Sequence, residues 1–342
     1  MSSLDKTTKL AILRALNDAD HGASSSEITE RIQAFGLDLS PRTVRLHMKT
    51  LESEGLVEPA RLGRSGGRSI TELGISEIAD AGALERLGFI VSKLDQMAWS
   101  MTYDPENNTD GTVVLNVSLI EAAQVSHALR EMFVVFQSKL GLGEYVGLFP
   151  PGTGVQGFEV PQRMFGIGTV CSVTANGVLI RRGVPVVSRF GGVLQIKNGK
   201  SSRFVDLITY EGTTLDPLEV FIKAGLTRVH EAAILGDGLV GASFREFPTG
   251  ASSVVESVRD ELEEKGLGGI LDIGKPNRPL LDIPVQEGRT AFTVAGGLNP
   301  AAAVEEMGIA TTNSALTMLH PMPSLVHYTE MQRIAMRMLK ES

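Results

Sequence analysis

Four short segments of this 342-residue chain concentrate small polar residues and arginine at the ends of expected strands. They read GTVCSVT (168–174), SRFGG (188–192), YEGTTLDP (210–217) and GASFRE (241–246). Hydroxyls and backbone N–H groups at helix starts, combined with arginine, form anion sites. We therefore expect a small dicarboxylate to bind here. Arg189 or Arg245 would pair with one carboxylate, and a helix start near Thr174 would take the other.

Each of these residues also has a purely structural interpretation. Arg189 and Arg245 could be ordinary ion-paired arginines. The Thr213-Thr214 pair could simply cap a helix that begins at Leu215. Cys171 lies in an apolar stretch, where an unreactive buried thiol is the common case. The sequence leaves these alternatives open.

A second set of candidate residues lies on a predicted helix that opens at Ser40-Pro41, a capping hydroxyl followed by proline at the first helical position. Its apolar stripe is Val44, Met48 and Leu51, so other side chains face solvent. These include types that reach phosphates and base edges in a major groove. The predicted DNA-binding residues on this helix are Arg42, Thr43, Arg45, His47 and Lys49.

A Gly-rich basic turn follows the predicted helix, between a strand at 56–58 and a return strand at 69–71. It contributes Arg61, Arg64 and Arg68 as predicted DNA contacts. The segment from Arg42 to Arg68 contains six basic and three acidic residues, although the whole chain carries a net charge of −8. The excess of positive charge therefore lies on the elements expected to meet DNA. The wing arginines could contact the backbone alone and contribute affinity without sequence choice.

Two further helices precede the one at Ser40, and a serine among 24–26 can cap the second, whose buried positions are Ile28, Ile32 and Phe35. Three helices followed by a hairpin with a basic tip predict a winged helix-turn-helix over residues 1–84. The alternative is a three-helix module that contacts protein, with a solvated basic hairpin.

Residues 85–325 predict a larger mixed α/β (α+β) regulatory domain, followed by a C-terminal helix in 326–342. Strand signals at 112–120, 145–149 and 168–173 alternate with helix signals, and a meander is expected at 184–210. The order of elements in 111–183 recurs after Gly238, and the strand exit before Asn176 resembles the one before Asn299. This pattern predicts an internal duplication with two similar lobes and a cleft between them.

Composition and motifs argue against several other classes of protein. The chain contains no G-x-S-x-G, P-loop or H-E-x-x-H motif, and its six histidines are scattered. A single cysteine excludes an internal disulfide framework and a thiolate-rich zinc site. The apolar runs are too short to span a bilayer, and the first residues carry no apolar signal core. We expect a cytoplasmic protein without metal, cofactor or membrane association.

Four longer runs resemble the regulatory domain of the NrpR family of archaeal nitrogen-regulation repressors. They are GTVCSVTANGVLIRRGVPVVSRFGG, YEGTTLDPLEVFIKAGLTRV, GASFREFP and GGLNPAAAVEEMGI, within a similarity that extends from about Gly88 to Ala315. The resemblance implies a dimer that represses nitrogen-assimilation genes from inverted-repeat operators and is released by 2-oxoglutarate. Since this chain has one regulatory domain, paired domains would come from a homodimer.

The resemblance strengthens the case for the polar segments, since Cys171, Ser172, Ser188, Arg189, Thr213 and Arg245 lie inside the family-like runs. Together with Thr174 at the expected helix start, these are the candidate effector-binding residues. We therefore expect a DNA-binding repressor whose operator affinity falls when 2-oxoglutarate binds, with double-stranded DNA, the dicarboxylate and a second copy of the chain as partners. Three alternatives stay open: a different small effector, an enzyme of small-molecule metabolism with an accessory helical domain, and an adaptor that never touches DNA.

Overall fold

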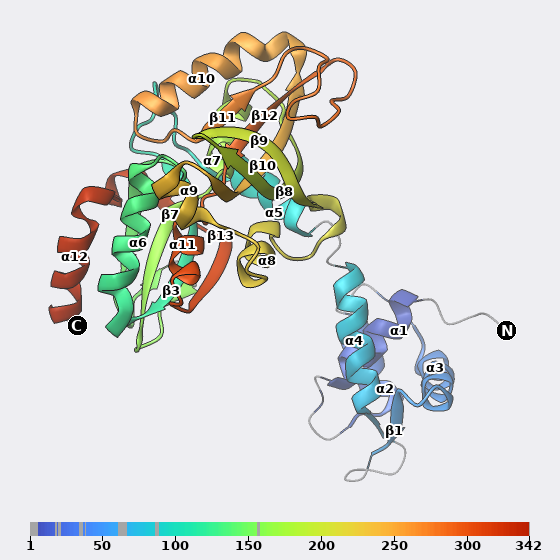
Figure 1. Cartoon of the computed structure of the whole chain (residues 1–342). Helices are drawn as coiled ribbons and strands as arrows, with labels where there is room; N and C mark the ends of the chain where they lie inside the picture. Colours follow the sequence, from blue (N-terminus) through green and yellow to red (C-terminus); the bar gives the residue numbers. More distant parts are fainter. Residues whose placement is uncertain are drawn as a thin grey trace. The chain divides into compact units, whose positions relative to one another are not determined.

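The computed structural model describes residues 6–17, 19, 22–33, 37, 39–60, 67–85, 89–155 and 158–341. The chain divides into two compact units, Met1–Leu87 and Gly88–Ser342, and each is described by itself (Figure 1). Within the described ranges, no helix is both long enough and apolar enough to cross a membrane.

The first unit is the predicted winged helix. Helices α1 (Lys6–Asn17), α2 (Ser25–Gln33) and α3 (Pro41–Ser53) are followed by the antiparallel hairpin of β1 (Val57–Pro59) and β2 (Arg68–Ile70), and then by α4 (Glu72–Glu85). Ile12, Leu16, Ile28, Val44 and Leu51 form the centre of its core. The apolar stripes predicted for the second and third helices therefore face this core, except that Phe35 lies outside the described residues.

Local capping explains where α2 and α3 begin. Ser24 Oγ accepts the N–H of Glu27, while the Glu27 carboxylate accepts the N–H of Ser24, a reciprocal capping box. At α3 the Ser40 hydroxyl accepts the N–H of Thr43, and Pro41 occupies the first turn. Both are signals that the sequence displays.

The second unit contains two five-stranded sheets in which every pairing is antiparallel within the described ranges. The first sheet has the order β13-β3-β7-β4-β14, and the second has the order β11-β12-β10-β8-β9. The strands of the first sheet are β3 (Thr112–Glu121), β4 (Tyr145–Phe149), β7 (Met164–Val170), β13 (Thr311–Pro321) and β14 (Val326–His327). Those of the second are β8 (Val187–Lys197), β9 (Lys200–Thr209), β10 (Gly238–Pro248), β11 (Ile270–Ile273) and β12 (Arg289–Ala295).

The expected duplication is present in the topology. Helix α6 (Val125–Gln137) joins β3 to β4, and α10 (Ser252–Glu264) joins β10 to β11. After β7 comes α7 (Val173–Arg181), and after β12 comes α11 (Asn299–Glu306). Each half is thus a split β-α-β unit whose third strand lies between the first and second. Equivalent helices and strands of the two halves lie 125 to 127 positions apart in the sequence. Differences of one to three residues occur at element ends and in the last strands.

The two halves exchange their last strands. Strand β8, which ends the first half, pairs with β10 of the second half, and β13, which ends the second half, pairs with β3 of the first. The helices that precede these strands, α7 and α11, are exchanged as well. Helix α7 of the first half packs against α10 of the second half, and α11 of the second half packs against α6 of the first. The chain therefore crosses between lobes twice, once directly after β7 and once directly after β12.

The two crossovers have hydrogen bonds at equivalent positions. Cys171 N–H donates to the carbonyl of Val114 at 2.7 Å, and Gly296 N–H donates to that of Gly241 at 2.8 Å. Three residues later, the Thr174 hydroxyl accepts the N–H of Val114, and the Asn299 side-chain oxygen accepts the N–H of Gly241. Thr174, and not Asn176 as expected from the sequence pattern, is therefore the counterpart of Asn299.

The same sequence, Gly-Leu-Gly, occurs at 141–143 and 266–268, and these loops meet across the pseudo-twofold axis. Gly143 N–H donates to Gly268 O at 2.8 Å, and Leu142 and Leu267 are both buried in the shared core. This contact joins the lobes beside the second crossover, since Ala295 N–H donates to Gly269 O and the Asn299 amide donates to Leu140 O.

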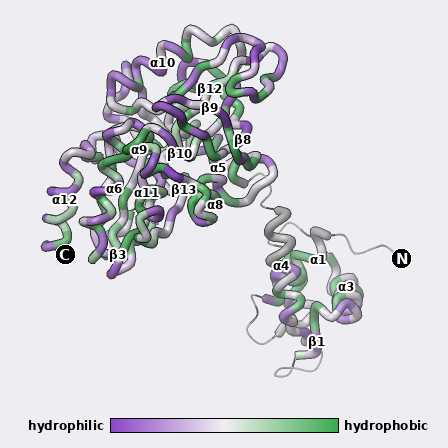
Figure 2. Tube along the Cα trace, in the orientation of Figure 1, coloured by the Kyte–Doolittle hydropathy of each residue, from purple (hydrophilic) through white to green (hydrophobic). Residues whose placement is uncertain are grey.

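Several elements were not predicted from the sequence. Helix α5 (Phe89–Ser100) packs on α7, and helix α9 (Val229–Leu235) lies between β9 and β10 in the chain. Helix α8 (Pro217–Lys223), in contrast, was predicted from Leu215 onward and begins two residues later. Strand β7 starts four residues earlier than expected. The C-terminal helix α12 (Tyr328–Glu341) lies beside α6 (Figure 1). Figure 2 shows hydrophilic residues along much of α10, in agreement with a narrow buried stripe of Val255, Val258 and Leu262.

Candidate functional site

A small cavity lies where the two crossovers pass each other. Cys171 and Ser172 line it from the first crossover, Gly297 from the second, and Asn116 and Leu316 from β3 and β13. The starts of α7 and α11 thus converge on one place, with α8 adding a third helix start through Asp216. Helix N-termini present free N–H groups and favour negative charge. The space open to a water-sized molecule is only about 10 Å³, so the cavity in this conformation is too small for a dicarboxylate.

Gly297 fixes how closely the crossovers approach. A Cβ atom at this position would lie 2.2 Å from the carbonyl oxygen of Val170 and 2.6 Å from the Asn116 side-chain nitrogen. Only glycine fits this distance. The two strand exits are therefore in direct backbone contact at the cavity.

Arg245 is fully buried beside this cavity. Its Nη1 donates to the carbonyl of Ser172 at 2.7 Å and also to Asn176 Oδ1, and its Nη2 donates to Ser172 Oγ at 2.7 Å. Its Nε has no partner, and among the described residues no carboxylate lies within ion-pair distance. Burial lowers the pKa of Arg245. A buried guanidinium without a counter-ion is costly, so its surroundings favour an anion.

Arg189 has a different environment from Arg245. Its Nη1 donates to Glu246 Oε1 at 2.6 Å, and that carboxylate is buried. The sequence left open that either arginine could be an ordinary ion-paired residue. This structural interpretation applies to Arg189. Ser188 accepts from the Asn176 amide at 3.2 Å, so it supports the network around Arg245 without lining the cavity.

Two predicted hydroxyls have structural partners. Thr174 Oγ1 accepts the Val114 N–H, as part of the crossover geometry. Thr213 Oγ1 donates to Leu215 O and accepts Leu215 N–H, which closes a turn ahead of α8. The cap of α8 is Asp216, whose side chain accepts the N–H of Leu218 at 2.9 Å.

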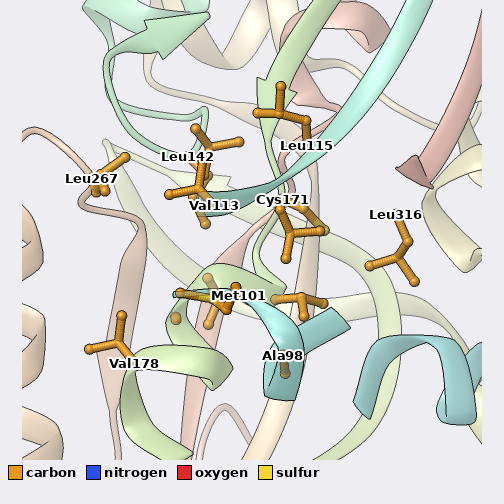
Figure 3. Close-up of a cluster of buried hydrophobic side chains, with 14 of the residues drawn as sticks. Ala98, Met101, Val113, Leu115, Leu142, Cys171, Val178, Leu267 and Leu316 are labelled. Atoms are coloured by element: carbon orange, nitrogen blue, oxygen red, sulfur yellow. The ribbon is translucent and has the colours of Figure 1, made fainter. Parts of the chain in front are cut away.

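Cys171 has an apolar setting on one side. In Figure 3 it lies among Val113, Leu115 and Leu316, within the shared core of the two lobes. Burial raises the pKa of the Cys171 thiol to about 11. The thiol is therefore neutral at physiological pH and is not activated as a nucleophile.

Three polar residues of the cavity and one residue with positive φ were not among the predicted site residues. Asp216 is buried, and burial followed by the nearby Glu219 raises its pKa to about 6. Asn116 Oδ1 accepts the N–H of Leu316 at 3.1 Å, where β13 bulges and Leu316 has φ of +51°. Tyr210 lines the cavity as well, and burial raises the pKa of its hydroxyl.

A larger hollow of about 210 Å³ lies at the two Gly-Leu-Gly loops. Its charged lining comes from Lys139, Glu144 and Glu263, and Lys139 is already paired with Glu263 at 2.6 Å. This balance of charge opposes an anion. The crossover cavity is the better candidate for an anion, because the starts of α7 and α11 converge on it and the Arg245 guanidinium is bonded to Ser172 of its wall without an ion pair.

In the first unit, α3 presents a basic face. Arg42, Arg45 and Lys49 are exposed, whereas Thr43 and His47 are only half exposed and Thr43 also pairs with the Ser40 hydroxyl. Leu46, which was not predicted as a site residue, is 63% exposed among them. Arg61 and Arg64 lie outside the described residues. Arg68 pairs with Glu52 at 2.8 Å, which ties the hairpin to α3.

No group of three or more histidine, cysteine or acidic side chains in the described part of the chain is arranged to hold a metal ion.

Comparisons with known proteins agree with this architecture. A family model of the NrpR regulatory domains NRD1 and 2 matches residues 87–331, and one of the ribonuclease R winged-helix domain matches residues 10–78. The global nitrogen regulator NrpRI of Methanosarcina mazei is 33% identical over 91% of this chain and 94% of its own length. A crystal structure of a nitrogen repressor-like protein from Methanococcus jannaschii matches with a TM-score of 0.58 and 28% identity, covering 70% of this chain and 98% of its own.

The global nitrogen regulator NrpR of Methanococcus maripaludis is 26% identical over 96% of this chain, but the match covers only 56% of that relative. The chain thus spans about half the length of this longer relative and nearly all of the shorter one. The relatives are named as regulators, and the winged helix implies DNA binding. The chain is a nitrogen-regulating transcription regulator, not an enzyme, and it belongs to the NrpR family.

Proposed function

We propose that the chain is a repressor of nitrogen-assimilation genes that binds an inverted-repeat operator as a homodimer and is released by 2-oxoglutarate. The resemblance of the regulatory domain to its family suggests this effector and this sign of control. The winged helix and the family membership support the DNA-binding half of the proposal.

The observation that carries the effector half is Arg245. Its guanidinium is buried at the crossover, bonded only to neutral groups, and has a free Nε. A dicarboxylate bound between the starts of α7 and α11 would supply the missing negative charge. Of the predicted effector residues, Cys171 and Ser172 line this cavity and Arg245 lies directly beside it. The remaining four hydrogen-bond to other parts of the protein: Thr174, Ser188, Arg189 and Thr213.

The position of the cavity suggests how ligand binding could change the protein. Because both crossovers border the cavity, a ligand that separates them would alter the relative orientation of the lobes. By linkage, a ligand that prefers the open arrangement weakens operator binding only if the operator-bound protein prefers the closed one. Leu94 of α5 also lines the cavity, and α5 is the first helix after the winged-helix unit.

The test is a titration of the full-length protein with 2-oxoglutarate, followed by thermal shift and by the fluorescence of its single tryptophan. Trp99 lies exposed on α5, which packs against α7. We expect a ligand-induced rise in Tm by mass action and a saturable change in fluorescence. Arg245→Met should abolish both responses at ligand concentrations that saturate the wild type.

Arg189→Met is the matched control. The same change at the ion-paired arginine leaves Glu246 buried without a partner and should lower Tm. Its ligand affinity at a temperature where it is folded should change by no more than about twofold, since it lies off the cavity. Wild-type binding by Arg245→Met would reject the site. A response to other oxo-acids but not to 2-oxoglutarate would keep the site and favour the second candidate, a regulator with a different small effector.

A further inference from the structure

The exposed face of α3 has an apolar residue at its centre. Val44, Met48 and Leu51 are buried in the winged-helix core. At about 100° per residue, Leu46 lies about 200° from Val44 around the helix axis, opposite that core. Its side chain is 63% exposed.

Basic side chains surround Leu46 on this face. Arg42 lies one turn before it and Lys49 almost one turn after it, with Arg45 alongside. Together with Thr43 these residues line a shallow hollow of about 340 Å³. The acidic residues Glu52 and Glu54 come only at the last turn of the helix, and Glu52 is paired with Arg68. The middle of the face is therefore cationic around an apolar tip.

This combination is complementary to a major groove. Arginine and lysine reach the phosphates on either side of the groove, so Leu46 between them would face the base edges. Leucine neither donates nor accepts hydrogen bonds. The apolar feature that base pairs present in the major groove is the 5-methyl group of thymine.

We infer that Leu46 contacts the 5-methyl group of a thymine and determines the base preference at one position of each operator half-site. This inference rests on the DNA-binding role of the winged helix. It adds a residue that selects sequence to the basic residues, whose phosphate contacts supply affinity without selecting it.

A single exposed leucine is common on protein surfaces, so its surroundings matter. Leu73 and Ile75 of α4 are exposed to a similar extent, at 57% and 49%, but they lie between Glu72 and Glu77. Acidic neighbours oppose contact with DNA. Leu73 therefore provides a control at which the same substitution should leave base preference unchanged.

The experiment selects binding sites from random duplex DNA with the full-length protein, at one fixed salt concentration, for the wild type, Leu46→Ala and Leu73→Ala. We expect wild type and Leu73→Ala to select the same sites, with thymine at one position per half-site. Leu46→Ala should lose the preference there and keep it elsewhere. Since Leu46 is exposed, this variant should keep the wild-type Tm.

Replacing that thymine with deoxyuridine removes only the methyl group. We expect the wild type to lose about fourfold in affinity, the equivalent of one methyl group no longer buried, and Leu46→Ala to be indifferent. Identical selected sites for Leu46→Ala and the wild type would overturn the inference alone, and would favour a protein partner for Leu46. Failure of the wild type to select any sequence would overturn the inference together with the DNA-binding function.

Discussion

At the residue scale, the crossover cavity combines two buried charges that respond oppositely to an anion. Arg245 attracts it, whereas the Asp216 carboxylate repels it when ionised. Asp216 caps α8 and Arg245 bonds to the start of α7. The two charges still act on each other, because Asp216 opposes the lowering of the Arg245 pKa by burial. The balance between them depends on pH.

The affinity for 2-oxoglutarate should rise as the pH falls from 7.5 to 5.5. Burial raises the pKa of Asp216 to about 6, so over this interval the residue changes from mostly ionised to mostly neutral. An anionic ligand prefers the neutral form, and we expect a gain of several-fold. Isothermal titration across this range measures it.

Asp216→Asn should remove this pH dependence. Asparagine caps helices about as well as aspartate, so α8 keeps its cap. In the folded protein the raised pKa means that ionisation of Asp216 costs stability as pH rises through about 6. The variant should therefore have a higher Tm than the wild type at pH 7.5, and the difference should shrink as the pH falls through 6 toward the ordinary aspartate pKa of 3.8. An unchanged pH profile of ligand binding would exclude Asp216 from the site.

The sequence predicted the residue types of the cavity better than their individual roles. It placed Arg189 and Arg245 in equivalent motifs, and only the fold gives Arg189 a buried carboxylate partner. It also missed Asp216, because a residue that precedes proline at a helix start looks like an ordinary cap. Leu46 was missed for a simpler reason: an apolar residue on an exposed face carries no functional signal until its basic neighbours are located around it.

At the element scale, the duplicated order of strands and helices was readable from the sequence, since each element has its own periodicity and turn residues. The exchange of β8 and β13 between lobes was not. Periodicity states that a strand exists but does not identify its partner. The winged helix was predicted more fully, because Ser40, Pro41 and the apolar stripe of α3 act locally.

Gly297→Ala should destabilise the second unit strongly, because its new Cβ would overlap the Val170 carbonyl. We expect a loss of about 3 kcal/mol or more in the free energy of unfolding, at the upper end of overpacking effects. Gly250→Ala is the control, since nothing lies within 4 Å of its added Cβ. Urea denaturation compares them. Equal stability of the two variants would contradict the close approach of the crossovers.

Ser40→Ala should destabilise the winged-helix unit by about 1 kcal/mol through the lost cap of α3. The Ser40 hydroxyl accepts the Thr43 N–H at 3.2 Å. Ser53→Ala, at the opposite end of the helix, removes a hydroxyl that donates to a carbonyl of its own helix and should cost less. Hydrogen exchange of the α3 amides reports the difference, and equal protection in both variants would argue against the cap.

At the scale of the whole molecule, the two units have separate cores and separate tasks. The winged helix presents α3. The second unit holds a cavity where its two crossovers, which directly follow β7 and β12, pass each other. Helix α5 connects these tasks in sequence, since it follows the winged-helix unit and contributes Leu94 to the cavity. A ligand at the crossover would thus act on the first element behind the DNA-binding unit.

The central claim is that ligand binding at the crossover lowers operator affinity. The most direct measurement is the dissociation constant of the full-length protein for a selected operator, at constant salt and pH, with increasing 2-oxoglutarate. We predict a saturable weakening of about five- to 150-fold, the usual range of allosteric coupling, that disappears in Arg245→Met while its affinity without ligand is retained. Operator affinity that stays constant up to millimolar 2-oxoglutarate, or a weakening that persists in Arg245→Met, would contradict the account.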